Sequence, residues 1–109
     1  MAFDEAFAAR IRKVLKGTRV VDERRMFGGL IFMVNGNMAA GIHKADLIVR
    51  VGPAASEEAL DEPGTAVFDI TGRPMKAWVL VKAAAVVDDR KLREWVQRGV
   101  AFARSLPRK

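Results

Sequence analysis

The stretch from Arg24 to Met38 constrains the fold of this chain more than any other part of the sequence. An apolar run from Met26 to Val34 ends at Asn35-Gly36, and a second apolar segment begins at Met38. Asn-Gly between apolar runs is typical of a two-residue hairpin, because both central residues of a type I′ turn need positive φ angles, which these residues tolerate best. The sequence therefore predicts two antiparallel strands joined at this turn.

The strand before the turn is apolar on both faces. Leu30, Phe32 and Val34 alternate with Ile31 and Met33, whereas an ordinary antiparallel strand keeps one polar face. Two arrangements fit this pattern. Either helices cover one face and a partner subunit the other, or the strand lies at the centre of the sheet beneath a second layer.

The glycine pair Gly28-Gly29 resembles part of a phosphate-binding loop. Such loops lie between a strand and a helix, with Lys-Ser/Thr following in the Walker case, whereas here Leu-Ile-Phe follows and continues as a strand. We therefore expect a β-bulge, or a point where another backbone or an aromatic ring packs closely on the glycines. Trp78 and Trp95 are the candidate rings, and Trp95 is expected in the core.

The remaining pattern predicts an α+β fold with the order α-β-β-β-α-β-β-α and a five-stranded, mainly antiparallel sheet. Phe3, Phe7, Ile11, Val14 and Leu15 recur at helical spacing, with Asp4 or a neighbour expected to cap the start of that helix, and Gly17 ends it. Thr18–Glu23 is expected as a connection with some strand character. The other expected elements are strands at Met38–His43, Leu47–Val51, Ala66–Ile70 and Ala77–Lys82, a short helix at Ser56–Leu60, and a final helix from Asp88 or Asp89 to just before Pro107.

Length and composition predict one domain over residues 1–109, located in the cytoplasm. The chain has no cysteine, and its longest uncharged run is broken by glycines, so no membrane span and no contact with a membrane are expected. The N-terminus lacks the pattern of a signal peptide. The net charge is +6, and residues 88–109 carry most of the excess, with seven basic and three acidic side chains.

The inventory of chemically reactive groups predicts no enzyme. His43 is the only histidine, no serine stands in a nucleophile-elbow context, and thiolate ligands are absent. The acidic residues Glu57, Glu58, Asp61 and Glu62 are expected to form a solvated helix face, because they lack the alternating pattern of a calcium loop. We expect no catalytic residue, metal or cofactor. An enzyme would need a deep pocket near His43 or Arg73.

Two basic groups suggest nucleic-acid binding as an alternative function. Arg24 and Arg25 stand beside Met26 and Phe27, a basic and aromatic mixture that nucleic-acid-binding proteins use. The final helix carries five cations off its apolar stripe, which could track phosphates with strong salt dependence. These are Arg90, Lys91, Arg93, Arg98 and Arg104.

Several motifs together resemble the TfoX/Sxy N-terminal domain family over about residues 3–107. They are Arg25-Met26-Phe27-Gly28-Gly29 before an apolar strand, Asn35-Gly36, Gly72-Arg73-Pro74-Met75 with Trp78-Val79, and Asp88-Asp89 before the helix with Leu92 and Trp95-Val96. The resemblance implies an α+β fold similar to that of secretion-chaperone-like domains. Full-length members regulate natural competence with the cyclic-AMP receptor protein and carry a second, helical C-terminal domain. Only the first domain is matched, so we expect a stand-alone N-terminal domain. The family supplies no established catalytic residues.

The resulting hypothesis is a non-enzymatic regulatory or protein-interaction domain with a protein partner of unknown identity, and a homodimer is one form that this interaction could take. The residues expected to form its family motif or interaction surface are Arg24, Arg25, Met26, Phe27, Gly28, Gly29, Arg73 and Trp78.

Overall fold

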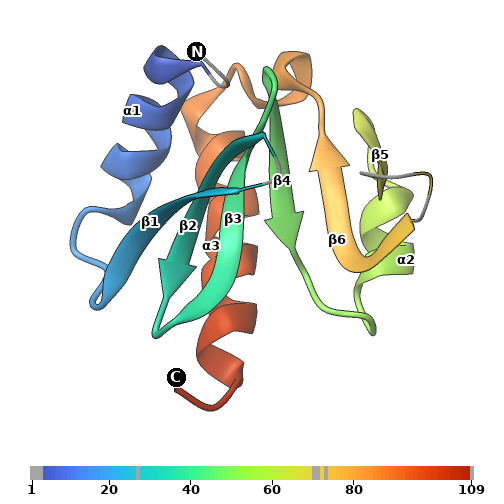
Figure 1. Ribbon diagram of the computed structural model, residues 1–109. Helices are drawn as coiled ribbons and strands as arrows, with labels where there is room; N and C mark the ends of the chain where they lie inside the picture. The colour runs from blue at the N-terminus through green and yellow to red at the C-terminus, as the bar shows by residue number, and fades with distance from the viewer. Residues whose placement is uncertain (1–3, 27, 70–71, 73, 109) are drawn as a thin grey trace.

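The computed structural model describes residues 4–26, 28–69, 72 and 74–108, which form an antiparallel sheet with three α-helices. The sheet has six strands in the order β1-β2-β3-β4-β6-β5 (Figure 1). The elements are α1 (Glu5–Leu15), β1 (Val21–Met26), β2 (Gly29–Val34), β3 (Asn37–His43), β4 (Asp46–Arg50), α2 (Ser56–Leu60), β5 (Thr65–Asp69), β6 (Pro74–Val81), the 3-10 helix η1 (Ala83–Val86) and α3 (Asp89–Ser105).

The α+β class is confirmed, but the prediction of five strands is wrong. The sixth strand is β1, which pairs with β2 from Val21↔Val34 to Met26↔Gly29. Its four central residues are charged and exposed, and for this reason the sequence pattern predicted a connecting segment in place of a strand. Charged side chains are common on edge strands, where they oppose pairing with another chain. The expected single strand from Met26 to Val34 is also wrong, because Met26 ends β1 and Gly28, at φ 71°, lies in the turn before β2. β2 is therefore next to the edge and not central.

The predicted signals at turns and helix ends are confirmed. Asn35 and Gly36 both have positive φ angles, 54° and 79°, between β2 and β3. The Asp4 carboxylate accepts hydrogen bonds from the first turn of α1, and Asp88 caps α3 in the same way. α3 ends at Ser105, before Pro107. β6 begins at Pro74, three residues earlier than the strand expected from Ala77.

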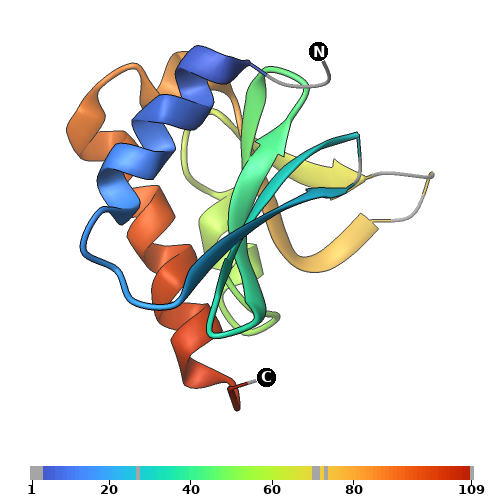
Figure 2. The ribbon, with the colours of Figure 1, turned by 60° about the vertical axis from the view of Figure 1, so that its left-hand side comes forward.

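One face of the sheet packs against the helices. Leu30, Phe32 and Val34 of β2 point to this face and belong to a cluster with buried side chains of α1, α2 and α3, called here the helix-side cluster. Figure 2 shows α1 and α3 side by side on this side of the sheet. The expectation that helices cover one face of the apolar strand is confirmed.

The opposite face buries a second group, the strand-side cluster, through curvature of the sheet itself. It consists of Ile31, Met33, Ile48, Phe68 and Trp78. The rings of His43 in β3 and Phe68 in β5 lie 5.2 Å apart, although two strands separate β3 from β5. In a flat sheet this separation would be about 14 Å, three strand spacings. The curled strands therefore cover the face for which a partner subunit or a second layer was expected.

Gly29 is a point of close backbone approach. A Cβ atom placed on it would lie 1.8 Å from the carbonyl oxygen of Ile42 in the neighbouring strand. Of the arrangements predicted for the glycine pair, close packing of another backbone is confirmed at Gly29, whereas the pairing of β1 with β2 shows no bulge there and the atoms nearest to Gly29 belong to the backbone of β3 and not to a ring. Trp95 lies in the helix-side cluster, as expected of a core residue, and Trp78 in the strand-side cluster.

A bidentate ion pair joins α1 to β1. The Nε and Nη2 atoms of Arg12 each donate to Glu23 over 2.8 Å. This hydrogen bonding lowers the pKa of Glu23 and raises that of Arg12, and their mutual attraction adds to both shifts. Both side chains are partly exposed, at 42% for Arg12 and 34% for Glu23, so the pair contributes only modestly to stability.

The two glycines of the motif should respond differently to alanine. Gly29→Ala should lower the free energy of unfolding by about 3 kcal/mol, because β2 and β3 must separate to admit the methyl group. Gly28→Ala has nothing within 4 Å of the new atom and should cost about 1 kcal/mol for the positive φ angle alone. Urea unfolding followed by tryptophan fluorescence measures both values, and equal costs would contradict the contact with Ile42.

The Arg12–Glu23 pair should make stability depend on pH. A lowered folded-state pKa means that the contribution is present above the unfolded pKa of about 4.3 and is lost as the pH falls through the lower folded value. Glu23→Gln should therefore destabilise the protein by about 0.5–1 kcal/mol at pH 7, with a difference that shrinks below about pH 4. Urea unfolding across this range tests the effect. Glu57→Gln, at an exposed position, is the control and should show no such trend.

Candidate functional site

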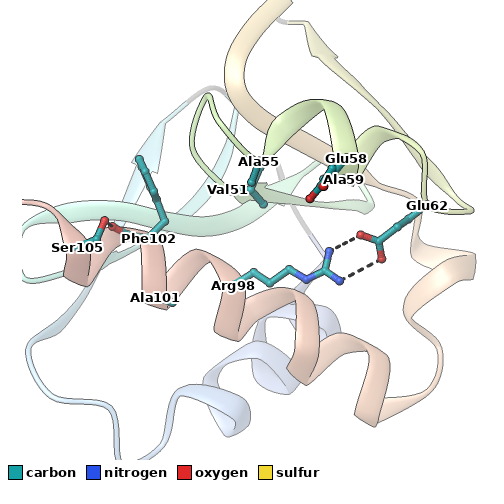
Figure 3. A pocket seen from close by; sticks show the side chains of 9 residues that line it. All are labelled: Val51, Ala55, Glu58, Ala59, Glu62, Arg98, Ala101, Phe102 and Ser105. Carbon is teal, nitrogen blue, oxygen red and sulfur yellow. Dashed lines mark hydrogen bonds and ion pairs between the residues drawn. The ribbon is translucent and has the colours of Figure 1, made fainter.

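A hollow with a volume of about 480 Å³ lies between α2 and α3. We call it the α2–α3 groove. Its walls come from the end of β4, the segment that leads into α2, α2 itself and the second half of α3 (Figure 3). The lining residues are Val51, Ala55, Glu58, Ala59, Glu62, Arg98, Ala101, Phe102 and Ser105.

The floor of the groove is apolar and held by tight contacts. Ala59 is buried, and a Cβ atom on Gly52 would lie 2.5 Å from the Phe102 ring, so the ring rests directly on the Gly52 backbone. The guanidinium of Arg50 lies 5.3 Å from the centre of the same ring. Phe102 is half-buried, and these contacts fix its ring as one wall of the groove.

The rim of the groove is ionic. Arg98 of α3 reaches across to Glu62, which follows α2, and donates two hydrogen bonds to its carboxylate (Figure 3). The same guanidinium lies 4.2 Å from the centre of the Trp95 ring, a cation–π contact that holds the side chain in place. Glu58 has no ion pair among the described residues. The rim therefore carries one uncompensated negative charge.

The α2–α3 groove is suited to binding. The hydroxyl group in its lining, Ser105 Oγ, donates a hydrogen bond of 2.6 Å to the Phe102 carbonyl. No histidine lines the groove to act as a general base for this hydroxyl group. Over the ranges that the structure describes, no group of three His, Cys, Asp or Glu side chains could hold a metal ion. His43 lies elsewhere, half-buried, with its ring and that of Phe68 in an edge-to-face arrangement.

Among the described residues predicted for an interaction surface, the side chains lie on both faces of the sheet, and some are buried. Arg24 pairs in register with Ile31 and Arg25 with Leu30, so their side chains leave opposite faces of the sheet. Trp78 and Gly29 are buried, and Met26 is half-buried against the strand-side cluster. Gly28 is exposed in the turn before β2. The predictions for Phe27 and Arg73 lie outside the described residues.

The structure also divides the cations predicted on α3. Arg98 belongs to the rim of the α2–α3 groove, and Lys91 lies 4.0 Å from Glu94 on the same helix. Arg90, Arg93 and Arg104 have no ion pair within the part of the chain that is described. Arg93 faces α1 and not α2.

Sequence reasoning missed the α2–α3 groove because its residues are far apart in the chain. Glu62 was expected on a solvated face, but it accepts the hydrogen bonds of Arg98, 36 residues later. Phe102 lies half-buried at the border of the apolar face of α3, whereas Val100 is fully inside that face. The opposite charges of Glu62 and Arg98 were the available signal, and no spacing rule connects them.

Comparison with protein families gives one informative result. The family described as the TfoX N-terminal domain matches residues 13–103. Comparisons with curated proteins and with solved structures gave no significant match, so the likeness to secretion-chaperone-like domains stays a prediction. None of the described helices is long and apolar enough to cross a membrane. Because the match covers most of the chain, the protein belongs to the TfoX N-terminal domain family.

Proposed function

We propose that this chain is a non-enzymatic regulatory domain that acts by binding another protein in the α2–α3 groove. Family membership supports a regulatory role related to competence. The observation that carries the proposal is the combination of an apolar lining, formed by Val51, Ala59 and Phe102, with an ionic rim. Grooves of this kind accept the apolar face of a partner segment, while rim charges select its flanking residues.

The charges beside the groove indicate the chemistry of the partner segment. α2 and the residue after it carry Glu57, Glu58 and Asp61, and no basic residue lies among them. We infer a segment with one or two large apolar side chains next to a lysine or arginine that meets Glu58. Opposite charges at the rim would mainly speed association and exclude acidic competitors.

Self-association is a variant of this proposal, with a second copy of the chain as the partner. The strand-side cluster is the less suitable face for it, because Ile31, Ile48 and Phe68 are already fully buried by the chain's own strands. An interaction through the groove leaves that cluster intact. We therefore propose the groove for either partner.

Nucleic-acid binding stays the second candidate function. The set predicted from the sequence is divided, since Arg24 and Arg98 lie on different parts of the molecule and Arg98 is engaged by Glu62. A different observation favours this candidate, namely the unpaired cations between α1 and α3.

Ala101→Arg should abolish partner binding. Ala101 is exposed and lines the groove, so an arginine there fills the groove without disturbing the core. Gln97→Arg, one turn earlier on the exposed side of α3 and outside the groove lining, adds the same side chain as a control. Tagged wild-type protein should capture a partner from nuclease-treated cytoplasm, and titration of that purified partner should give at least tenfold weaker binding for Ala101→Arg only.

Light scattering of the same three proteins distinguishes a second copy from a different protein. A dimer lost in Ala101→Arg and kept in Gln97→Arg would identify a second copy as the occupant. Equal partner binding by all three proteins, or capture that disappears with nuclease, would contradict the proposal.

A further inference from the structure

A second hollow, between α1 and α3, is lined mainly by cations. Its volume is about 300 Å³, and its lining residues are Lys13, Val14, Lys16, Asp89 and Arg93. The lysines come from the end of α1 and its cap, and Arg93 comes from the first half of α3. We call this hollow the α1–α3 basic groove.

The cations of this groove have no anionic partner in the described chain. Lys13, Lys16 and Arg93 make no side-chain ion pair there. The one carboxylate in the lining, Asp89, accepts hydrogen bonds from Nη2 of Arg10 at 3.0 Å and from its Nε at 3.3 Å. On the other side of α1, the carboxylate of Glu23 is bound to Arg12. The positive charge of the groove is therefore uncompensated.

Helix electrostatics explain only part of this cluster. Lys13 and Lys16 lie at the C-terminal end of α1, where the helix dipole favours cations. Arg90 lies in the first turn of α3, where the same dipole disfavours a cation, and Arg93 lies just beyond that turn. α3 also brings Arg93 to a hollow already lined by two lysines. Sites where local stability is sacrificed in this way are expected to be functional.

We propose that the α1–α3 basic groove binds the phosphodiester backbone of nucleic acid. Lysine binds phosphate oxygens as a point charge and arginine as a planar fork, and a nucleic-acid strand presents such groups in series. No aromatic side chain lines the groove, so it offers no surface for stacking bases, and contact is with the backbone irrespective of sequence. The net charge of +6 adds long-range attraction.

This site differs from the basic surface expected from the sequence. It keeps Arg93, with Arg90 one turn earlier on α3, and adds Lys13 and Lys16 of α1. It leaves out Arg24 on the far face of the sheet and Arg98 in the α2–α3 groove. The inference is independent of the protein partner proposed above, because the two hollows share no lining residue.

Fluorescence anisotropy with a labelled 20-base-pair duplex of arbitrary sequence tests the proposal. Three phosphate contacts predict a slope of about −2.7 for the logarithm of the binding constant against that of salt concentration, so binding should weaken about 40-fold between 50 and 200 mM salt. Duplexes of different sequence should bind equally. Absence of saturable binding at about 50 mM salt, or saturable binding of polyglutamate in its place, would overturn the proposal.

Matched double variants locate the contact. Lys13→Gln with Arg93→Gln should weaken binding by at least about tenfold at 50 mM salt and reduce the slope to about −0.9. Lys76→Gln with Lys82→Gln removes the same net charge at exposed positions outside this groove and should leave the slope unchanged. Circular dichroism confirms that each variant is folded. Equal losses in both double variants, or loss of duplex binding in Ala101→Arg, would overturn the assignment to this groove.

Discussion

The close seating of α3 on β3 is the contact on which the rest of the structure depends. Gly99 permits it, because a Cβ atom there would lie 2.2 Å from the carbonyl oxygen of Ala39. Asn37 then locks the end of the helix through its side-chain amide, which donates to the carbonyls of Ala103 and Pro107. Asn37 is the only buried polar residue in the described part of the chain. Since a buried amide must keep its hydrogen bonds, this contact fixes both the height and the rotation of α3.

Because the rotation of α3 is fixed, its two sides face different helices. One flank turns Arg98 and Phe102 toward α2, where Arg98 is neutralised by Glu62 and Phe102 forms a wall. The other flank turns Arg93 toward α1, where it meets Lys13 and Lys16. A mixed-charge helix thereby borders an apolar groove with an acidic rim on one side and a cationic groove on the other. The two proposed binding activities are thus separate in space although they share one helix.

The sequence was sufficient for features that depend on neighbouring residues. The hairpin at Asn35-Gly36, the caps Asp4 and Asp88, and the two-sided apolar strand follow from turn chemistry and side-chain period. β1 was missed because its charges mask an edge strand. The curl of the sheet was also beyond local patterns, because the contact of His43 with Phe68 arises from twist accumulated over four strands. Both grooves combine segments distant in the chain, which periodicity cannot bring together.

The curl of the sheet also changes where a binding surface should be sought. A strand that is apolar on both faces suggests that one face meets a partner, and from the sequence this was the strongest indication of function. In the folded chain, Phe68 and Trp78 approach from β5 and β6 and bury Ile31 and Ile48 without any other molecule. The apolar residues on the second face are therefore fully explained by their contribution to the stability of the folded chain. The features that stability leaves unexplained lie on the helix side of the sheet, namely the unpaired Glu58 in the α2–α3 groove and the unpaired cations around Arg93. Because neither group of charges forms an ion pair that would stabilise the described chain, both are better explained by what the protein binds.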